Sequence, residues 1–314
     1  MPAAEPAYSP TLIPAKPDPR VTRVFVWYTR RLFAKKFFAV RLMPGSAECL
    51  HSLNRYNGPA IIVMTHGSWW DPMTAILLHY HKWTNADDTP RPSAAPMDAA
   101  MLKRFGIFRK LGVFGIDPDS PASLEAMGAY MLERFAAEPR TSLWVTAQGH
   151  FHDPRTPPRL RPGAAWLAAR TPGVRVLCCA IEYAFWTDQR AETFVRLEEV
   201  PVRGAEPSAR EDRPEREANT GATAHAGGSN RASAPSTTDW LRAMQATMKS
   251  CTHELAEAVI ARDPARFVPL MGAGSTRINP FYDLWQKITG RGNQIEVRGT
   301  LPRPPAAIRK EAAR

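Results

Sequence analysis

The alternation of short apolar runs with helical patterns between residues 48 and 200 is the feature that most constrains the fold. The apolar runs have the length and composition of buried strands and span residues 60–64, 112–116, 141–146, 174–182 and 193–198. The segments between them that place apolar residues at helical spacing are residues 72–82, 98–110, 120–137 and 162–170. Strands and helices that alternate in this way form a largely parallel sheet covered by helices. We therefore predict a single α/β domain with a largely parallel central sheet flanked by helices.

Composition divides the rest of the chain into segments with different expected behaviour. Residues 1–19 are rich in Pro and Ala and are expected to form a disordered leader. Residues 203–238 contain no aromatic residue, and such a segment cannot bury enough apolar surface to offset its loss of conformational entropy. We therefore predict a disordered loop there, inserted into one domain formed by residues 20–200 and 239–289. Residues 290–314 are expected to be a basic, Pro-rich tail.

Helical patterns are also present near both ends of this domain. Residues 20–42 carry an apolar stripe with additional aromatic residues, and basic residues gather on the other side. This amphipathic helix is expected to pack on the domain, and its aromatic and basic flank suits a membrane interface; both can hold at once. Asp239 is the expected N-cap of a second helix, whose apolar residues recur at spacings of three and four and should pack back on the domain.

Basic residues predominate in this chain, with 41 Lys and Arg against 30 Asp and Glu and a net charge of +11. An anionic partner is therefore expected, and phosphorylated substrates, anionic membranes and nucleic acid all fit this charge. Because the basic residues form no recognised nucleic-acid-binding motif, we expect no nucleic-acid partner. The four cysteines show no paired metal spacing and indicate a reducing, cytosolic compartment. No apolar stretch is long enough to predict a membrane-spanning helix.

The candidate catalytic pair, His66 and Asp71, follows the first predicted strand. Loops at the carboxyl ends of parallel strands commonly carry functional groups. A neutral imidazole can accept a hydroxyl proton near pH 7, and a carboxylate at its other nitrogen would orient the ring. This pairing requires the loop to turn before the helix begins. In the alternative interpretation, Asp71 only caps the helix at residues 72–82 and His66 is an ordinary loop histidine.

Four sequence blocks resemble, in order, those of the lysophospholipid and 1-acylglycerol-3-phosphate acyltransferases. The blocks are the His-x4-Asp motif at residues 66–71, and residues 111–117, 144–149 with 160–164, and 178–183. The resemblance covers about residues 48–200, and its first block is the most specific. It implies a one-step transfer of an acyl group from a thioester to a hydroxyl, with His66 as general base and Asp71 as its orienting carboxylate. It also implies acyl-CoA or acyl-carrier protein as cosubstrate, no cofactor and a lipid acceptor in a membrane.

The chain departs from the pattern of that family where the family binds phosphate. Pro118 lies near the place of an expected Arg in the second block, and Gln148 replaces the usual Glu of the third block. His150 and Phe151 stand where Thr and Arg are usual. Because Arg binds phosphate in a bidentate manner, these changes weaken the expectation of a phosphorylated acceptor.

Five residues near the third block remain candidates for substrate binding. The amide of Gln148 can hydrogen-bond an acceptor hydroxyl, and Gly149 with its neighbouring backbone amides can line the oxyanion or acceptor site. Arg155, Arg159 and Arg161 follow directly and could hold a phosphate, or they are solvated loop charges. A metal ion is not expected, because the nearby His and Asp residues at positions 150, 152 and 153 match no metal-binding spacing.

The sequence therefore predicts an O-acyltransferase that acylates a lysophospholipid of the 1-acylglycerol-3-phosphate type. The same chemistry on a phosphate-free lipid alcohol, a glycolipid or a carotenoid glycoside is the first alternative. A noncatalytic lipid-binding relative is the second. The expected location is cytoplasmic and peripheral, on the inner face of the cell membrane, with contact through residues 20–42.

Overall fold

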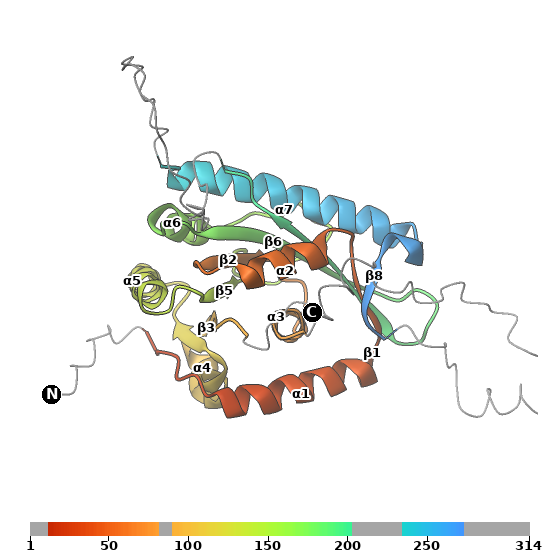
Figure 1. The fold of residues 1–314 in the computed structure, drawn as a ribbon, viewed down its shortest axis with the longest axis horizontal. Coiled ribbons are helices and arrows are strands. Elements are labelled where there is room, and N and C mark those ends of the chain that lie inside the picture. The colour runs from red at the N-terminus through yellow and green to blue at the C-terminus, as the bar shows by residue number, and fades with distance from the viewer. Residues whose placement is uncertain (1–11, 82–89, 203–233, 273–314) are drawn as a thin grey trace, which may run out of the picture.

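The computed structural model describes residues 12–81, 90–202 and 234–272, which form one α/β layer structure (Figure 1). Its sheet has eight strands in the order β4-β3-β5-β2-β6-β7-β1-β8. The strands are β1 (Phe37–Leu42), β2 (Ala60–Met64), β3 (Ser93–Asp98), β4 (Val113–Ile116), β5 (Ser142–Val145), β6 (Arg175–Ala184), β7 (Ala191–Glu199) and β8 (Val268–Gly272). Strands β4, β3, β5, β2 and β6 are parallel, β7 runs antiparallel to β6, β1 pairs parallel with β7, and β8 is antiparallel to β1. The predicted fold class is confirmed.

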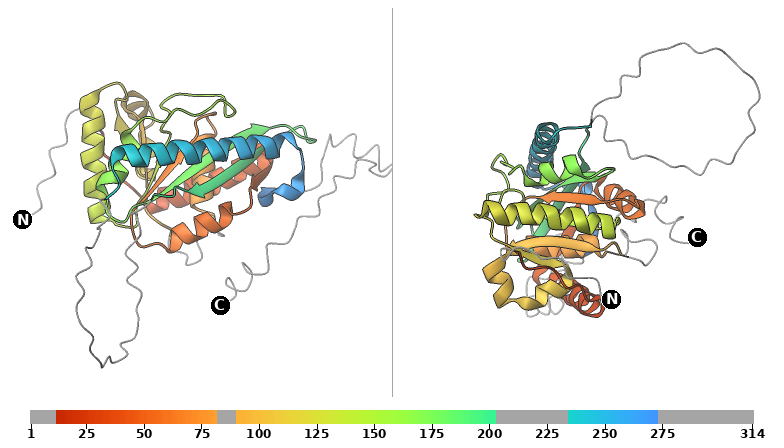
Figure 2. Two further views of the ribbon diagram at one scale, coloured as in Figure 1. Left: turned by 90° about the horizontal axis from the view of Figure 1, so that it is seen from above. Right: turned by 90° about the vertical axis from the view of Figure 1, so that its left-hand side faces the viewer.

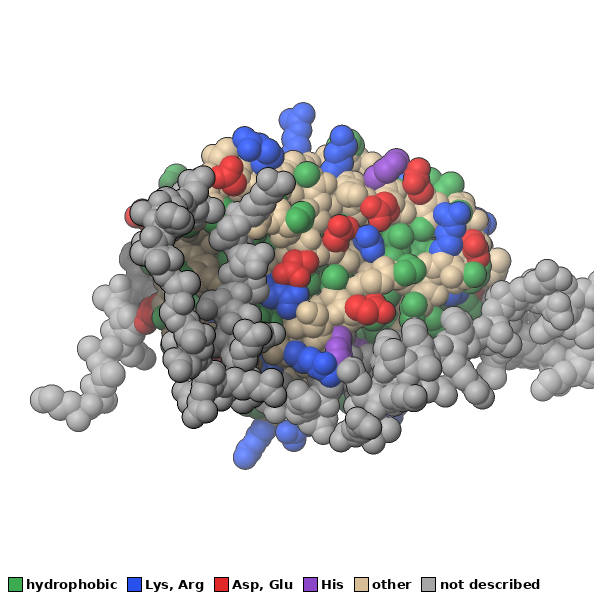
Figure 3. Space-filling model, turned by 45° about the horizontal axis from the view of Figure 1, so that its top comes forward, with side chains coloured by type: hydrophobic (Ala, Val, Ile, Leu, Met, Phe, Trp, Pro, Cys, Tyr) green, Lys and Arg blue, Asp and Glu red, His purple; other side chains and the backbone are tan. Residues whose placement is uncertain are grey.

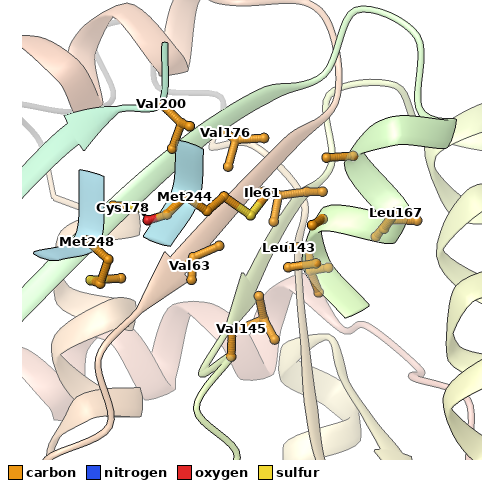
Figure 4. Close-up of a cluster of buried hydrophobic side chains, with 14 of the residues drawn as sticks. Ile61, Val63, Leu143, Val145, Leu167, Val176, Cys178, Val200, Met244 and Met248 are labelled. Atoms are coloured by element: carbon orange, nitrogen blue, oxygen red, sulfur yellow. Dashed lines mark hydrogen bonds between the residues drawn. The ribbon is translucent and has the colours of Figure 1, made fainter. Parts of the chain in front are cut away.

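Helices cover both faces of this sheet (Figures 1 and 2). They are α1 (Pro19–Lys36), α2 (Ser46–Arg55), α3 (Asp71–His79), α4 (Ala99–Arg104), α5 (Pro121–Ala137), α6 (Gly163–Arg170) and α7 (Thr237–Ile260), with 3-10 turns η1 (Gly106–Leu111) and η2 (Pro264–Arg266). Side chains of α5, α6 and α7 share one buried cluster with one face of the strands, whereas α1, α2 and α3 share a second cluster with the other face. In β2, Ile61 and Val63 point into the first cluster (Figure 4). Ile62 belongs to the second cluster, so the central strand is buried on both faces.

The helix predicted for residues 20–42 ends at Lys36, and residues 37–42 form the strand β1. All six residues of β1 are buried between β7 and β8. A strand that is buried on both faces shows no alternation of apolar and polar residues, so its apolar run was indistinguishable from a continuation of the helical stripe. The predicted helix at residues 98–110 is likewise divided, into α4 and η1.

The expectation of a disordered leader at residues 1–19 is wrong for residues 12–19, of which Pro19 already belongs to α1. Ile13 forms two backbone hydrogen bonds with Gly115 of β4, of 2.9 and 2.8 Å, and Leu12 is buried. The Asp18 carboxylate then accepts hydrogen bonds from the amides of Arg20 and Val21 and caps α1.

The C-terminal helix α7 packs on the sheet as predicted, but its N-cap is Ser236 and not Asp239. Asp239 is the third helical residue, and its carboxylate bonds back to the Ser236 amide in a capping box. Of the loop predicted at residues 203–238, only residues 234–238 are described. The end of the predicted domain, residues 273–289, and the tail at residues 290–314 lie outside the described residues.

A buried polar cluster fixes the amino end of the sheet, away from the candidate catalytic pair. The Arg91 guanidinium donates to the Ser142 hydroxyl at 2.9 Å and to the carbonyl of Gly58 at 2.6 Å. Burial lowers the pKa of His79 to about 4, so this imidazole is neutral. Its Nε2–H donates to the Arg91 carbonyl at 2.8 Å, and its Nδ1 accepts from the Trp144 indole at 3.2 Å. These bonds hold the end of α3 in place and thereby position its other end, Asp71.

Candidate active site

The loop between β2 and α3 brings His66 and Asp71 into contact. Nδ1 of His66 lies 3.2 Å from Oδ2 of Asp71. The Asp71 side chain is completely buried, while 20% of the His66 side chain is exposed. The loop turns before the helix begins, as the pairing requires, and Pro72 follows in the first turn of α3. One nitrogen of the imidazole therefore faces the carboxylate, and the other is directed away from it.

The Asp71 carboxylate organises this loop. Its Oδ2 atom accepts hydrogen bonds from the backbone amides of Gly67 at 2.8 Å and Ser68 at 2.9 Å, in addition to facing His66. These donors precede Asp71 in the chain, so the carboxylate does not serve merely as a cap for the amides of α3. The alternative interpretation, in which Asp71 only caps that helix, does not describe this arrangement.

Tyr183, at the end of β6, completes the hydrogen bonds of Asp71. Its hydroxyl donates to Oδ1 at 2.9 Å and lies 2.9 Å from the hydroxyl of Thr74. Burial raises the pKa of Tyr183 well above its usual value, and the charge of Asp71 adds to this effect, so the phenol remains a donor. The sequence did not predict a role for Tyr183, which is 112 residues from Asp71. The available signal was its position directly after the strand predicted at residues 174–182, which is β6 and pairs with β2.

The loop that follows β5 holds the backbone of His66 from both sides. The side-chain oxygen of Gln148 accepts a hydrogen bond from the His66 amide at 2.9 Å, and the His152 amide donates to the His66 carbonyl at 2.7 Å. Gln148 is only 5% exposed. The amide oxygen that was expected to meet the acceptor therefore positions the histidine.

An exposed aromatic side chain, Phe151, borders the imidazole of His66, and a second, Trp69, packs against Phe151. The Phe151 ring lies 4.2 Å from the His66 ring, and Trp69 lies 5.3 Å from Phe151. Phe151 is 43% exposed and Trp69 is 75% exposed. Together they give the edge of the site an apolar border.

The other predicted substrate-binding residues have different environments. Gly149 has a φ of +81°, and a Cβ atom there would lie 2.7 Å from the Arg161 guanidinium, so the loop requires glycine. Arg155 donates two hydrogen bonds to Glu182, of 3.0 and 2.5 Å. Arg159 is exposed. Arg155 therefore has a carboxylate partner, whereas the Arg161 guanidinium lies beside Gly149.

Neither a metal centre nor a membrane span is found in the described residues. No group of three or more His, Cys, Asp or Glu side chains there is placed to hold a metal ion. The rings of His150 and His152 contact each other at a tilt of 49°, with their centroids 4.1 Å apart. No described helix has both the length and the apolar character needed to cross a bilayer.

Comparison with known proteins gives matches among solved structures. The sequence matches no protein-family model and no curated protein. Among solved structures, it is similar to the 1-acyl-sn-glycerophosphate (LPA) acyltransferase PlsC from Thermotoga maritima, with a TM-score of 0.47 and 14% sequence identity. The match covers 75% of this chain and 80% of that chain.

Proposed function

We propose that the protein is an O-acyltransferase that moves a fatty acyl group from an acyl thioester to a hydroxyl of a lipid. The observation that carries this proposal is the contact between His66 and the buried Asp71 at the carboxyl end of β2. A buried carboxylate at one imidazole nitrogen stabilises the charge that forms when the other nitrogen takes a proton. The four donors around Asp71 keep this carboxylate in one orientation.

In the proposed reaction, Nε2 of His66 accepts the proton of the acceptor hydroxyl. The oxygen of that hydroxyl attacks the thioester carbonyl at the same time. The tetrahedral intermediate then collapses, the carbon–sulfur bond breaks, and the leaving thiolate takes the proton from His66. The products are an ester and a free thiol, and no covalent acyl-enzyme forms. The protein's own thiols are poor nucleophiles here, because burial raises the pKa of Cys178 and Cys179 well above the usual value.

The acceptor is proposed to be a lysophospholipid of the 1-acylglycerol-3-phosphate type, and the donor acyl-CoA or acyl-carrier protein. A second candidate is a phosphate-free lipid alcohol, glycolipid or carotenoid glycoside. The ion pair between Arg155 and Glu182 favours this second class, because a phosphate would have to compete with a carboxylate for that guanidinium. The same chemistry would then act at the inner face of the cell membrane, where the chain is proposed to bind peripherally.

An assay with several acceptors tests the proposal and separates these classes. The purified full chain is given an acyl-CoA, or the acyl-carrier protein thioester, together with 1-acylglycerol-3-phosphate, a monoacylglycerol or a glycolipid. Thiol release is followed optically and the acylated lipid is identified by mass spectrometry. We expect thiol release to depend on one acceptor class. If no acceptor promotes thiol release but lipids still bind, the protein is instead a noncatalytic lipid-binding relative.

Tyr183→Phe should lower kcat by about three- to tenfold, with little change in KM for donor or acceptor. The variant removes one hydrogen bond from Asp71, worth about 1 kcal/mol, and no group that meets a substrate. Thr74→Val is the matched control, because it breaks the bond on the other side of the Tyr183 oxygen and leaves the bond to Asp71. An equal decrease of kcat in both variants would show that Tyr183 contributes only to packing.

A further inference from the structure

Positive charge is concentrated on two segments that are distant in sequence. Helix α1 contains six Lys and Arg residues and no Asp or Glu. The segment of residues 99–111, which comprises α4 and η1, contains four more and again no Asp or Glu. Asp18 and Asp98, which directly precede the two segments in the sequence, accept hydrogen bonds from backbone amides and cap α1 and α4. These two segments therefore have a net charge of +10, against +11 for the whole chain.

The same two segments expose large apolar side chains. On α1, Val24 is 64% exposed, Trp27 56% and Tyr28 49%; on the second segment, Phe105 is 40% and Ile107 49% exposed. They make up half of the exposed large hydrophobic residues among the described parts of the chain. The buried residues of α1, Thr29 and Phe33, lie on its other side. The exposed side of α1 is therefore apolar for a reason other than core packing.

The two segments form one continuous surface. The Phe25 ring of α1 contacts Phe108 of η1 edge-on at 6.1 Å, and Phe108 lies 6.2 Å from Phe105. Figures 1 and 2 show α1 and α4 side by side on the face of the molecule opposite α7. In contrast, acidic and basic side chains are interspersed on the face that contains α7 (Figure 3).

We propose that α1 and residues 99–111 together form a docking surface for an anionic lipid bilayer. Trp and Tyr side chains favour the headgroup region, and Lys and Arg are attracted by anionic lipids. The guanidinium of Arg31 lies 4.8 Å from the Trp27 ring, which places charge and apolar surface together. An acidic protein partner could also bind the Lys and Arg residues of this surface. Such a partner would not account for the exposed aromatic side chains that lie between these residues.

The position of α1 connects this surface to the candidate active site. Helix α1 leads directly into β1, whose first residue, Phe37, lies 4.9 Å from Trp70 and 5.8 Å from Tyr183 in ring-centroid distance. Docking would therefore bring the carboxyl end of β2, where His66 lies, toward the lipid. The docking itself does not require acyl transfer; its use in delivering an acceptor rests on the proposed function.

Vesicle flotation of the purified full chain tests the proposal. We expect binding to vesicles of equal parts phosphatidylcholine and phosphatidylglycerol, weak binding to phosphatidylcholine alone, and loss of binding as salt is raised. Phe105→Ser with Ile107→Ser should raise the lipid concentration for half-maximal binding by about tenfold, and Lys103→Glu with Arg104→Glu should do the same. The matched controls, Ile260→Ser and Lys249→Glu, change exposed residues of α7 and should bind like the wild type.

The outcomes separate docking from catalysis. His66→Ala should float like the wild type even where thiol release is lost, while the docking variants should keep acylating an acceptor in detergent micelles. Equal binding to neutral and anionic vesicles would overturn the proposal. Wild-type flotation of folded variants at positions 103–107, or tighter binding to a short DNA duplex than to anionic vesicles, would overturn it as well.

Discussion

His66→Ala should lower kcat of acceptor-dependent thiol release by about a thousandfold, because it removes the only group proposed to take the hydroxyl proton. The fold should be retained, since the side chain is partly exposed and makes a single hydrogen bond, to Asp71. The measurement is steady-state kinetics with the acceptor that the assay of several acceptors identifies, together with a thermal unfolding curve.

The matched control for this variant is His253→Ala, which removes an exposed histidine of α7 and should have wild-type kinetics. A folded His66→Ala protein that still transferred the acyl group at the wild-type rate would contradict the proposed mechanism. Loss of activity with loss of the folded state would leave the general-base role to be judged from His66→Gln, which keeps polarity and volume but cannot act as the base.

Asp71→Asn should also lower kcat by about two to three orders of magnitude, with much smaller changes in KM. The amide oxygen of Asn can still accept from Gly67 and Ser68, and its NH₂ group can donate to Tyr183, whose hydroxyl can then donate to Thr74. The loop is therefore preserved, but the negative charge that stabilises the imidazolium of His66 is lost. Kinetics of the purified variant with a saturating donor measure this effect.

Asp71→Ala separates the charge from the hydrogen bonds. It leaves two loop amides and the Tyr183 hydroxyl without their acceptor in a buried site, which costs about 1–3 kcal/mol for each unsatisfied group. We expect a lower thermal midpoint for Asp71→Ala than for Asp71→Asn. Similar kcat values for Asp71→Asn and the wild type would show that the carboxylate has only this structural role.

The sequence predicted the central strands well and predicted β1 and β3, which lie toward opposite sides of the sheet, poorly. Residues 60–64 form a continuous apolar run because β2 is buried on both faces between β5 and β6. Strand β1 follows α1 with no intervening loop, so no turn residue marked the boundary. Strand β3 contains Pro96 and only short side chains before Met97, and its extended conformation depends on pairing with β4 and β5.

The candidate site was predictable only where its residues are close in sequence. His66 and Asp71 were linked by spacing, and their contact needs only one turn of the loop. Tyr183 and Gln148 reach the same pair from β6 and from the loop after β5, so their contacts depend on the order of strands in the sheet. The ion pair between Arg155 and Glu182 could not be predicted for the same reason. This ion pair is the observation that bears on the acceptor class.

The pairing of Ile13 with Gly115 also covers part of an exposed edge of the sheet. Strand β4 is an edge strand, and an edge strand with free backbone groups is a template for association with other chains. Ile13 occupies the amide and the carbonyl of Gly115, and a Cβ atom at that position would approach the Ile13 side chain to 3.1 Å. Residues that composition predicted to be disordered therefore reduce the exposure of this edge to aggregation.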